Sequence, residues 1–328
     1  MIFQYLVAFV AAFAVTAVVG SFLVPALRRA KAGQMIREDG PVWHNKKQGT
    51  PTIGGIMFII GIAIACPVAG TWQIMEGDLT YIYVFLFGLA YAAIGFIDDL
   101  KKLKKKENLG LKARYKFLLQ LVVAALFIFL MRWSGNLITS LYIPFFNVAF
   151  SVPEPIYYVF AAFVAVATVN SVNITDGADG LVTGVTIPVA AFFAVVSVVW
   201  GFASLGMFAS AITGGLAAFL IFNFYPAKVF MGDTGAQFLG GAVCAMAFVC
   251  DMPIILIPLG IVYIVETLSD IIQVAFFKLT HGKRVFKMAP LHHHFEMCGW
   301  SERKLFVVFT AISAVFAVIS YFGIRFRS

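Results

Sequence analysis

Charged side chains are scarce in this sequence. Asp, Glu, Lys and Arg make up 12% of its 328 residues, whereas hydrophobic residues make up 61%. A soluble domain needs about 25% charged residues to cover its surface, so the composition excludes a soluble globular enzyme, and the high hydrophobicity excludes a disordered chain. The apolar runs are long and do not alternate with polar residues, which indicates membrane-spanning helices and the all-α class.

Cysteine is also rare. The four cysteines, Cys66, Cys244, Cys250 and Cys298, contain no CxxC pair, which excludes a disulfide framework. A cleavable signal is not expected, because residues 1–27 lack a basic leading segment and exceed the length of a signal's apolar core. No internal repeat suggests the inverted halves of a transporter. We expect a single transmembrane domain over residues 1–328.

Charge-poor runs long enough to cross roughly 30 Å of hydrocarbon recur along the chain. They cover residues 1–27, 48–75, 79–97, 117–131, 155–175, 180–227, 234–250, 251–278 and 305–324. The run 180–227 is long enough for two spans joined by a hairpin near Trp200, and 251–278 is interpreted as one long span with a polar inner half. The sequence therefore predicts ten membrane helices.

Positive charge is unevenly divided between the two sides that ten spans define. Of the 24 lysines and arginines, 21 fall on alternate loops, and only Arg132, Arg325 and Arg327 fall on the other side. Cytoplasmic loops are enriched in Lys and Arg, so we expect both termini outside and five loops in the cytoplasm. Most acids and all five histidines lie in or beside these loops, which places the chemistry on the cytoplasmic face.

Two adjacent aspartates, Asp98 and Asp99, follow the third predicted span. Carboxylates at a helix C-terminus oppose the helix dipole and repel each other, so they need a cation or a proton. Lys101 and Lys102 come next and offer a solvated salt-bridge cluster as one explanation. A functional site that attracts a cation is the other.

A second acidic motif follows the fifth predicted span, where Asn173, Asp176 and Asp179 are spaced i, i+3, i+6. This spacing lines one side of a helix, and the intervening glycines let backbone approach a ligand closely. Glycine-flanked acids also occur in plain turns. Two unneutralised acids at a membrane boundary are costly, however, which favours a functional role.

Asp233 is the sole acid between Asp179 and Asp251. It is interpreted either as a helix cap or as part of a carboxylate set with the other inner acids. Mg²⁺ prefers hard oxygen ligands and shares them with substrate phosphates, so such a set is suited to this ion.

Cations and histidines also lie on the predicted inner face. Lys47 and Thr52 stand in a glycine-rich stretch that either starts the second span or holds an anionic group. His292, His293 and His294 lack the spacing of a helical zinc pair, so we expect them to bond phosphate or sugar.

Glu266 and Asp270 are four residues apart in the ninth predicted span. They are interpreted as buried structural partners of a lysine or, alternatively, as groups with a direct role. Carboxylates, hydroxyls, cations and histidines at the edge of a hydrocarbon layer suit phosphoryl transfer from a cytosolic anionic donor to a lipid phosphate. The residues alone do not name the transferred sugar.

Five motifs together resemble the polyprenyl-phosphate N-acetylhexosamine-1-phosphate transferases. They are Lys-Gln-Gly-Thr-Pro-Thr-Ile-Gly-Gly (47–55), Gly-Phe-Ile-Asp-Asp (95–99), Asn-Ile-Thr-Asp-Gly-Ala-Asp-Gly (173–180), Val-Phe-Met-Gly-Asp-Thr-Gly (229–235) and Ala-Pro-Leu-His-His-His-Phe-Glu (289–296). The resemblance covers essentially the whole chain. The last motif favours the branch whose donor is UDP-N-acetylmuramoyl-pentapeptide (UDP-MurNAc-pentapeptide).

The resemblance implies Mg²⁺-dependent transfer of phospho-N-acetylmuramoyl-pentapeptide to undecaprenyl phosphate at the bacterial inner membrane, giving lipid I and UMP. It implies that Asp98 is the base, that Asp99 supports metal or lipid phosphate, and that Asp233 binds Mg²⁺. It also implies a nucleoside pocket, with Phe230 stacking on uracil, and contacts to phosphates or amino sugar. The pocket residues are Asn173, Asp176, Asp179, Asn223 and Phe230, and the contacts are Lys47, Thr52, Lys102, Lys116, Gln273, His292, His293 and His294.

The sequence departs from the family pattern at a few positions. Ala178 stands where this branch usually has leucine, Ile53 where it often has methionine, and Ala236 and Gln237 where Ser-Leu is common. The nearest alternative function is the same chemistry with UDP-N-acetylglucosamine, and one of another class is a membrane transporter.

Some questions are left open by the residues. One-step attack and a covalent aspartyl-phosphate route use the same groups. The oligomeric state, including a homodimer, is also undecided. The net charge of +8 is explained by topology and anionic substrates within a lipid bilayer, without nucleic acid.

Overall fold

The computed structural model describes residues 1–30, 33, 47–105, 110–135 and 137–325. Within these ranges the chain is helical apart from one hairpin, in which β1 (Ser140–Ile143) pairs antiparallel with β2 (Val148–Ser151), and an isolated bridge between Gly33 and Pro51. The predicted all-α class is confirmed.

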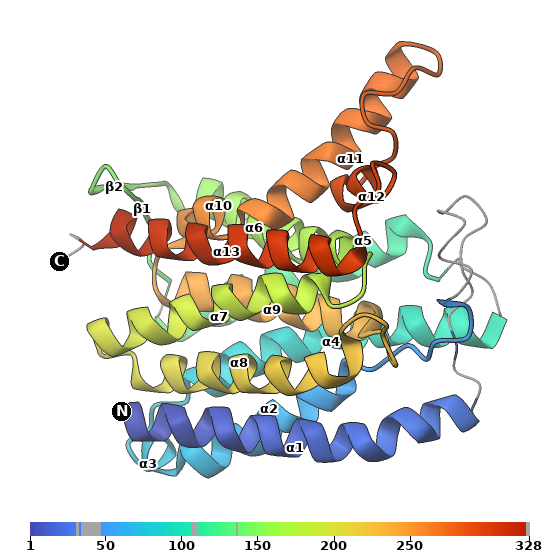
Figure 1. The fold of residues 1–328 in the computed structure, drawn as a ribbon. Coiled ribbons are helices and arrows are strands. Elements are labelled where there is room, and N and C mark those ends of the chain that lie inside the picture. The colour runs from blue at the N-terminus through green and yellow to red at the C-terminus, as the bar shows by residue number, and fades with distance from the viewer. Residues whose placement is uncertain (31–32, 34–46, 106–109, 136, 326–328) are drawn as a thin grey trace.

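The long helices lie side by side, and both termini lie at the same end of the bundle (Figure 1). The helices are α1 (Ile2–Arg29), α2 (Ile56–Ala69), α3 (Thr71–Met75), α4 (Thr80–Lys105), α5 (Ala113–Trp133), α6 (Glu154–Thr175), α7 (Leu181–Trp200), α8 (Ala203–Asn223), α9 (Gly232–Val249), the 3-10 turn η2 (Pro253–Ile255), α10 (Leu256–Leu259), α11 (Ile261–Leu279), α12 (Leu291–Glu296) and α13 (Glu302–Ile324).

The chain is a multi-pass membrane protein. Within the described ranges, seven helices are long and apolar enough to cross a membrane, namely α1, α4, α5, α6, α7, α8 and α13, and a bent pair of segments after α9 makes eight if counted as one span. The other two expected spans correspond to α2, which has 14 residues, and to α9. The count of ten and the outward-facing termini stay predictions.

Helix α9 lies in the centre of the bundle, where α4 and α6 are its main neighbours. Every residue from Thr234 to Phe248 is buried, so other helices surround α9 and it presents no face to lipid over this length. Glycines allow the close packing, because a Cβ at Gly240 would lie 2.6 Å from the Val169 Cα.

Two expected spans differ from the structure. In 48–75, the α-helix begins only at Ile56, and the preceding stretch pairs with the segment before α9. Phe230 N donates to Pro51 O, and Gly54 N donates to Phe230 O, both at 2.8 Å. Non-helical backbone is tolerated within the bundle because another part of the protein satisfies its polar groups.

The run 251–278 is interpreted from the sequence as one long span. In the structure it is broken into two pieces. The axes of Pro253–Leu259 and Ile261–Leu279 differ by 80°. Pro258 has no N–H to donate and Gly260 ends the first piece, which accounts for the break. In Figure 1, α11 consequently leans away from the bundle.

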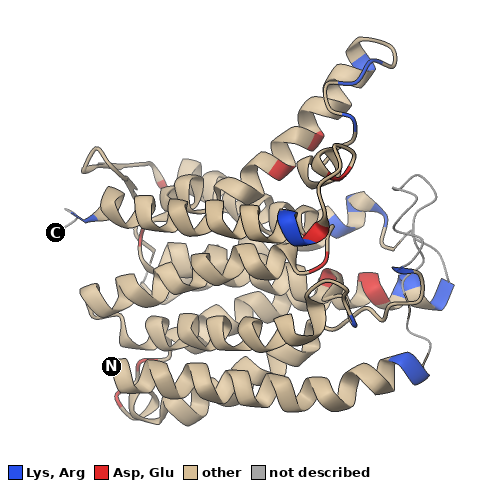
Figure 2. Cartoon of the chain, viewed as in Figure 1, with Lys and Arg blue, Asp and Glu red and all other residues tan. Residues whose placement is uncertain are grey.

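Charged residues gather at the end of the bundle opposite the termini (Figure 2). The predicted concentration of polar groups on one face is therefore present. Five cations of the topology prediction lie outside the described residues, namely Lys31, Arg37, Lys46, Lys106 and Arg327. That the charged end faces the cytoplasm stays a prediction.

Candidate active site

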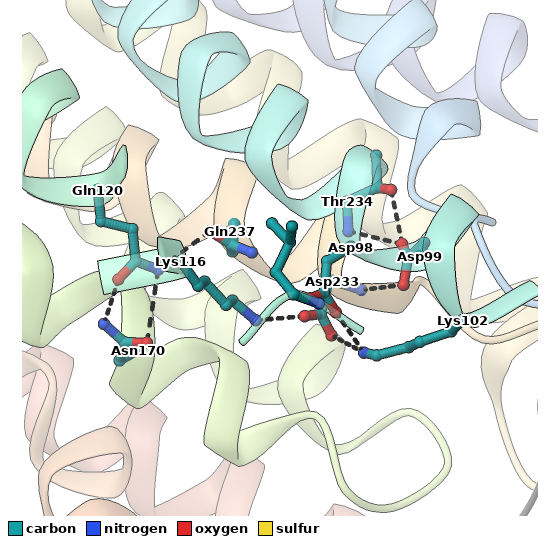
Figure 3. A network of polar contacts seen from close by, with 10 residues as sticks. Asp98, Asp99, Lys102, Lys116, Gln120, Asn170, Asp233, Thr234 and Gln237 are labelled. Atoms are coloured by element: carbon teal, nitrogen blue, oxygen red, sulfur yellow. Dashed lines mark hydrogen bonds and ion pairs between the residues drawn. The ribbon is translucent and has the colours of Figure 1, made fainter. Parts of the chain in front are cut away.

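Three aspartates and two lysines meet at the charged end of the bundle (Figure 3). We call Asp98, Asp99, Lys102, Lys116 and Asp233 the carboxylate–lysine cluster. Lys102 Nζ lies 2.7 Å from Asp98 Oδ2 and 3.1 Å from Asp233 Oδ1. Lys116 Nζ forms an ion pair with Asp233 Oδ2. Helices α4, α5 and α9 thus bring opposite charges to one point.

Asp99 caps the start of α9. Its Oδ1 accepts a hydrogen bond from Asp233 N at 3.2 Å. Its Oδ2 accepts from Thr234 N at 2.9 Å and from Thr234 Oγ1 at 2.7 Å. The first N–H groups of a helix lack partners within the helix and favour a negative charge, which explains how Asp99 is buried there. This contact also fixes the position of Asp233 in the first turn of α9.

Gly95 allows α4 to approach α9 closely. A Cβ at this position would lie 2.2 Å from the backbone oxygen of Asp233. Asp98 and Asp99 follow Gly95 about one turn later, on the same side of the helix. The closest approach of the two helices is therefore directly beside the acids.

A second charged group, the Lys47 cluster, consists of Lys47, Asp179 and Glu302. Lys47 Nζ lies 2.7 Å from Asp179 Oδ1 and 2.5 Å from Glu302 Oε2. Asp179 Oδ2 accepts from Ala227 N at 2.8 Å. Burial alone would lower the pKa of Lys47, but the two carboxylates outweigh it and raise this pKa, so Lys47 is positively charged.

The loop from Asp176 to Gly180 connects the charged groups. Burial raises the pKa of Asp176 well above its usual value, and the negative charges of Asp233 and Asp99 add to the shift. A bound cation would favour the ionised form of this half-buried carboxyl. On the other side, a Cβ at Gly177 would lie 2.1 Å from His292 Nε2.

Glu266 holds the first of the three histidines. Its Oε2 lies 2.8 Å from His292 Nδ1, and its Oε1 accepts from His292 N at 3.1 Å. Glu266 is thus a buried structural partner, as expected, but of a histidine and not of a lysine. His292 Nε2 is buried without a hydrogen-bond partner among the described residues. Asp270, one turn further on, is half-buried.

The other two histidines are held within their own segment. His293 Nδ1 lies 2.8 Å from Glu296 Oε2. His294 Nδ1 accepts from Lys287 N at 3.1 Å. His292 is therefore the histidine that the structure places against the 176–180 loop.

Two predicted substrate contacts bond the protein's own backbone. Asn223 accepts from Thr183 Oγ1 at 2.9 Å and donates to Val229 O at 3.0 Å. Gln273 accepts from Phe286 N and donates to Phe286 O, both at 3.0 Å. Both side chains shape the loops that surround the site.

The remaining predicted residues lie along the edge of the site. Thr52 is 4% exposed, and a Cβ at Gly232 would come within 2.7 Å of its Oγ1 and 2.6 Å of Asp99 Oδ2. Phe230 is half-buried on the segment that pairs with residues 51–54, and Asn173 is half-buried one turn before the 176–180 loop.

Sequence reasoning did not single out several of the residues that hold these groups. Glu302 resembles an ordinary first-turn acid, because it directly follows the helix cap Ser301. Gln120, Asn170 and Gln237 form a buried amide network beside Lys116 and Asp233 (Figure 3). For Gln237, the departure from the family's common Ser-Leu was the one hint in the sequence of a special role.

In the part of the chain that the structure describes, no three or more His, Cys, Asp or Glu side chains are arranged as a preformed metal cage. Mg²⁺, however, usually binds through one or two carboxylates together with water and substrate phosphates. Asp233 and Asp98 share the Lys102 ammonium, so their carboxylates lie close enough together to fit that mode.

Comparison with known proteins identifies the family. The model of glycosyl transferase family 4 matches residues 81–251, which is more than half of the chain. The chain belongs to this family. The matched region runs from α4 through α9 and contains all three aspartates of the carboxylate–lysine cluster.

Full-length relatives in this family carry one name. The phospho-N-acetylmuramoyl-pentapeptide-transferase of Caldanaerobacter subterraneus is 42% identical over 325 residues, covering 99% of this chain and 100% of the relative. The proteins of that name from Clostridium acetobutylicum and Clostridium perfringens are 45% and 46% identical, covering 93% and 97% of this chain and 94% and 98% of the relatives. The resemblance predicted from the five motifs is confirmed.

Proposed function

We propose that this protein transfers phospho-N-acetylmuramoyl-pentapeptide from UDP-MurNAc-pentapeptide to undecaprenyl phosphate, giving lipid I and UMP. The carboxylate–lysine cluster is the observation that carries the proposal, because it gathers acids and cations at one end of an apolar bundle. A lipid phosphate reaches such a position from the membrane, and a nucleotide sugar reaches it from water. The names of the full-length relatives support this donor over UDP-N-acetylglucosamine.

Mg²⁺ is proposed as the cofactor, with Asp233 as its ligand; the Asp98 carboxylate contacts the same lysine, Lys102. When bound, the ion would neutralise the donor's pyrophosphate oxygens. The two carboxylates now face lysines, so binding would require Lys102 and Lys116 to turn toward the phosphate groups. Asp99 holds the N–H groups of α9 with both oxygens and is proposed to orient Asp233.

Asp98 is proposed as the base. Its Oδ1 accepts from Leu111 N at 2.6 Å and its Oδ2 faces Lys102, which hold the carboxylate in a fixed direction. It would take the proton of undecaprenyl phosphate, whose oxygen then attacks the β-phosphorus of the donor. The bond from the β-phosphorus to the bridging oxygen breaks, and UMP leaves with the electron pair.

Lys102 and Lys116 are proposed to stabilise charge during this transfer. Negative charge spreads over the phosphoryl oxygens in the transition state, and the two ammonium groups lie beside Asp233, the proposed metal ligand. The Lys47 cluster and the 176–180 loop are proposed to receive the nucleotide. The location that follows is the bacterial inner membrane, with the charged end of the bundle in the cytoplasm.

The test is a donor comparison with the purified protein, undecaprenyl phosphate and Mg²⁺. We expect equal amounts of UMP and lipid-linked product from UDP-MurNAc-pentapeptide, and neither from UDP-N-acetylglucosamine. UMP release from UDP-N-acetylglucosamine alone would reject the proposed donor. Absence of transfer with both donors, in a preparation that remains folded, would reject the transferase activity itself.

A further inference from the structure

Glu302 is the first residue of α13, yet it does not serve that helix alone. The cap of α13 is Ser301, whose side chain accepts from Lys304 N at 3.3 Å. Acids in a first helical turn ordinarily face water, where they favour the helix dipole. Glu302 is instead only 8% exposed and points across to a loop and to a lysine from distant parts of the chain.

One oxygen of Glu302 makes both contacts. Its Oε2 accepts from Lys47 Nζ at 2.5 Å and from Asp179 N at 3.0 Å. Asp179 in turn uses Oδ1 for the same lysine and Oδ2 for Ala227 N. Glu302 therefore joins α13 to the glycine-rich stretch before α2, to the 176–180 loop and, through Asp179, to the loop before α9.

The geometry leaves Lys47 partly available to a ligand. An ammonium group has three donors, and among the described residues two carboxylates account for two of them. The ion pairs with both carboxylates hold the Lys47 side chain in one orientation. Removal of Glu302 would leave Lys47 with Asp179 as its one described carboxylate partner and would take away the acceptor of the Asp179 backbone N–H.

We propose that Glu302 is a positioning residue for the donor nucleotide. It fixes the Lys47 ammonium and the backbone of Asp179 in the arrangement that receives the nucleotide part of the donor. The inference rests on the proposed function, which places the nucleotide at the Lys47 cluster. The contacts described for Glu302 do not include the carboxylate–lysine cluster, so its effect falls on donor affinity and not on the chemical step.

The experiment measures UDP binding and steady-state kinetics of Glu302→Gln in the full-length protein. We expect the Kd for UDP and the KM for the donor to rise about tenfold, with kcat within about twofold of wild type, because an amide is a weaker partner for the ammonium. Unchanged Kd and KM, or a fall in kcat alone, would overturn the inference.

Glu154→Gln is the matched control. Glu154 is also the first residue of its helix, α6, but it is exposed and pairs with Arg132 at 3.3 Å. This variant should bind UDP as wild type does. If Glu302→Gln lowers the melting temperature by more than a few degrees, Glu302→Asp, which keeps the charge, provides the second measurement. Glu302→Asp should recover part of the UDP affinity that Glu302→Gln loses. If it recovers no affinity, the carboxylate does not position the nucleotide site.

Two further variants separate this inference from the proposed function. Lys47→Ala and Asp179→Asn should each weaken UDP binding. If both bind UDP normally, the nucleotide does not lie at this cluster and the proposed site fails. If both are weakened while Glu302→Gln binds normally, only the role of Glu302 fails.

Discussion

Gln120 on α5 donates a hydrogen bond of 3.1 Å to Gln237 on α9, one helical turn beyond the ion pair between Lys116 and Asp233. Each glutamine lies four residues after the charged residue of its own helix, so the ion pair and the amide contact connect α5 and α9 on successive turns. Asn170 from α6 donates to Gln120 Oε1 at 2.8 Å and so extends the amide contact to a third helix. The buried amides thereby link three helices directly beside the candidate active site.

The two glutamines should differ in how much stability they provide. Gln120→Leu leaves the amides of Asn170 and Gln237 buried without their partner, and we expect the free energy of unfolding to fall by about 2 kcal/mol. Gln237→Leu also removes the Gln237 Nε2 group, which is buried without a partner among the described residues. The free energy of unfolding of Gln237→Leu should therefore fall by less than about 1 kcal/mol. Denaturant unfolding in detergent measures both, and equal losses would contradict the argument.

Asp233→Asn should remove the activity while leaving the fold intact. The change lowers the negative charge available to Mg²⁺ and leaves Lys102 and Lys116 without their shared partner, so we expect transfer to fall by at least about 100-fold. UMP release at saturating donor is the measurement. The control is Asp78→Asn, which should transfer at the normal rate. Asp78 lies at the other end of α4, where its Oδ1 accepts from Thr80 N, and an asparagine keeps this hydrogen bond. Normal rates in Asp233→Asn would reject the metal assignment.

The raised pKa of Asp176 predicts a specific pH dependence of stability. Between the ordinary pKa of an aspartate and the raised value, the folded protein keeps a proton that the unfolded chain has released. Stability must then fall as pH rises through this window. Asp176→Asn removes the titrating group, so its advantage in melting temperature over wild type should grow with pH in Mg²⁺-free buffer. Parallel curves for the two proteins would refute the shift.

Gly95→Ala should separate α4 from α9 and reduce both stability and activity. The new methyl group meets backbone atoms of Asp233, which cannot rotate away, and we expect a loss of about 3 kcal/mol. Gly88 lies two turns earlier on α4, where the nearest atom to an added Cβ is a Phe238 ring carbon at 3.1 Å. Gly88→Ala should cost less than Gly95→Ala, because the closest backbone atom, Phe238 O, is 3.2 Å from the added Cβ, against 2.2 Å at Gly95, and alanine favours the helix. Unfolding and UMP release of both variants test this contrast.

The sequence predicted the class and the position of most helices, because apolar length is a local signal. It also singled out the three aspartates that the structure brings together, because charge at a membrane boundary is a local signal too. It did not predict the non-helical pairing of Gly54 with Phe230, since a charge-free stretch has the same composition whether or not it is helical. The role of Glu302 was hidden for a similar reason, because its partners are distant in sequence.

Other differences come from competition for the same functional groups. The amides of Gln273 and Asn223 bond nearby backbone groups, and their role as substrate contacts stays a prediction. Glu266 was expected to pair with a lysine, and His292 takes that place. The nature of a buried acid's partner depends on which helix lies opposite, and this information is not contained in local spacing.

The close contact of α4 and α9 at Gly95 also limits how this site can vary. Asp98 and Asp233 are carried by helices whose backbones touch, so their separation is a property of the bundle and not of a mobile loop. A small molecule that fills the space between these carboxylates would meet a target of fixed dimensions. Resistance to such a molecule would then have to arise in the surrounding loops, since moving either aspartate means moving a membrane helix.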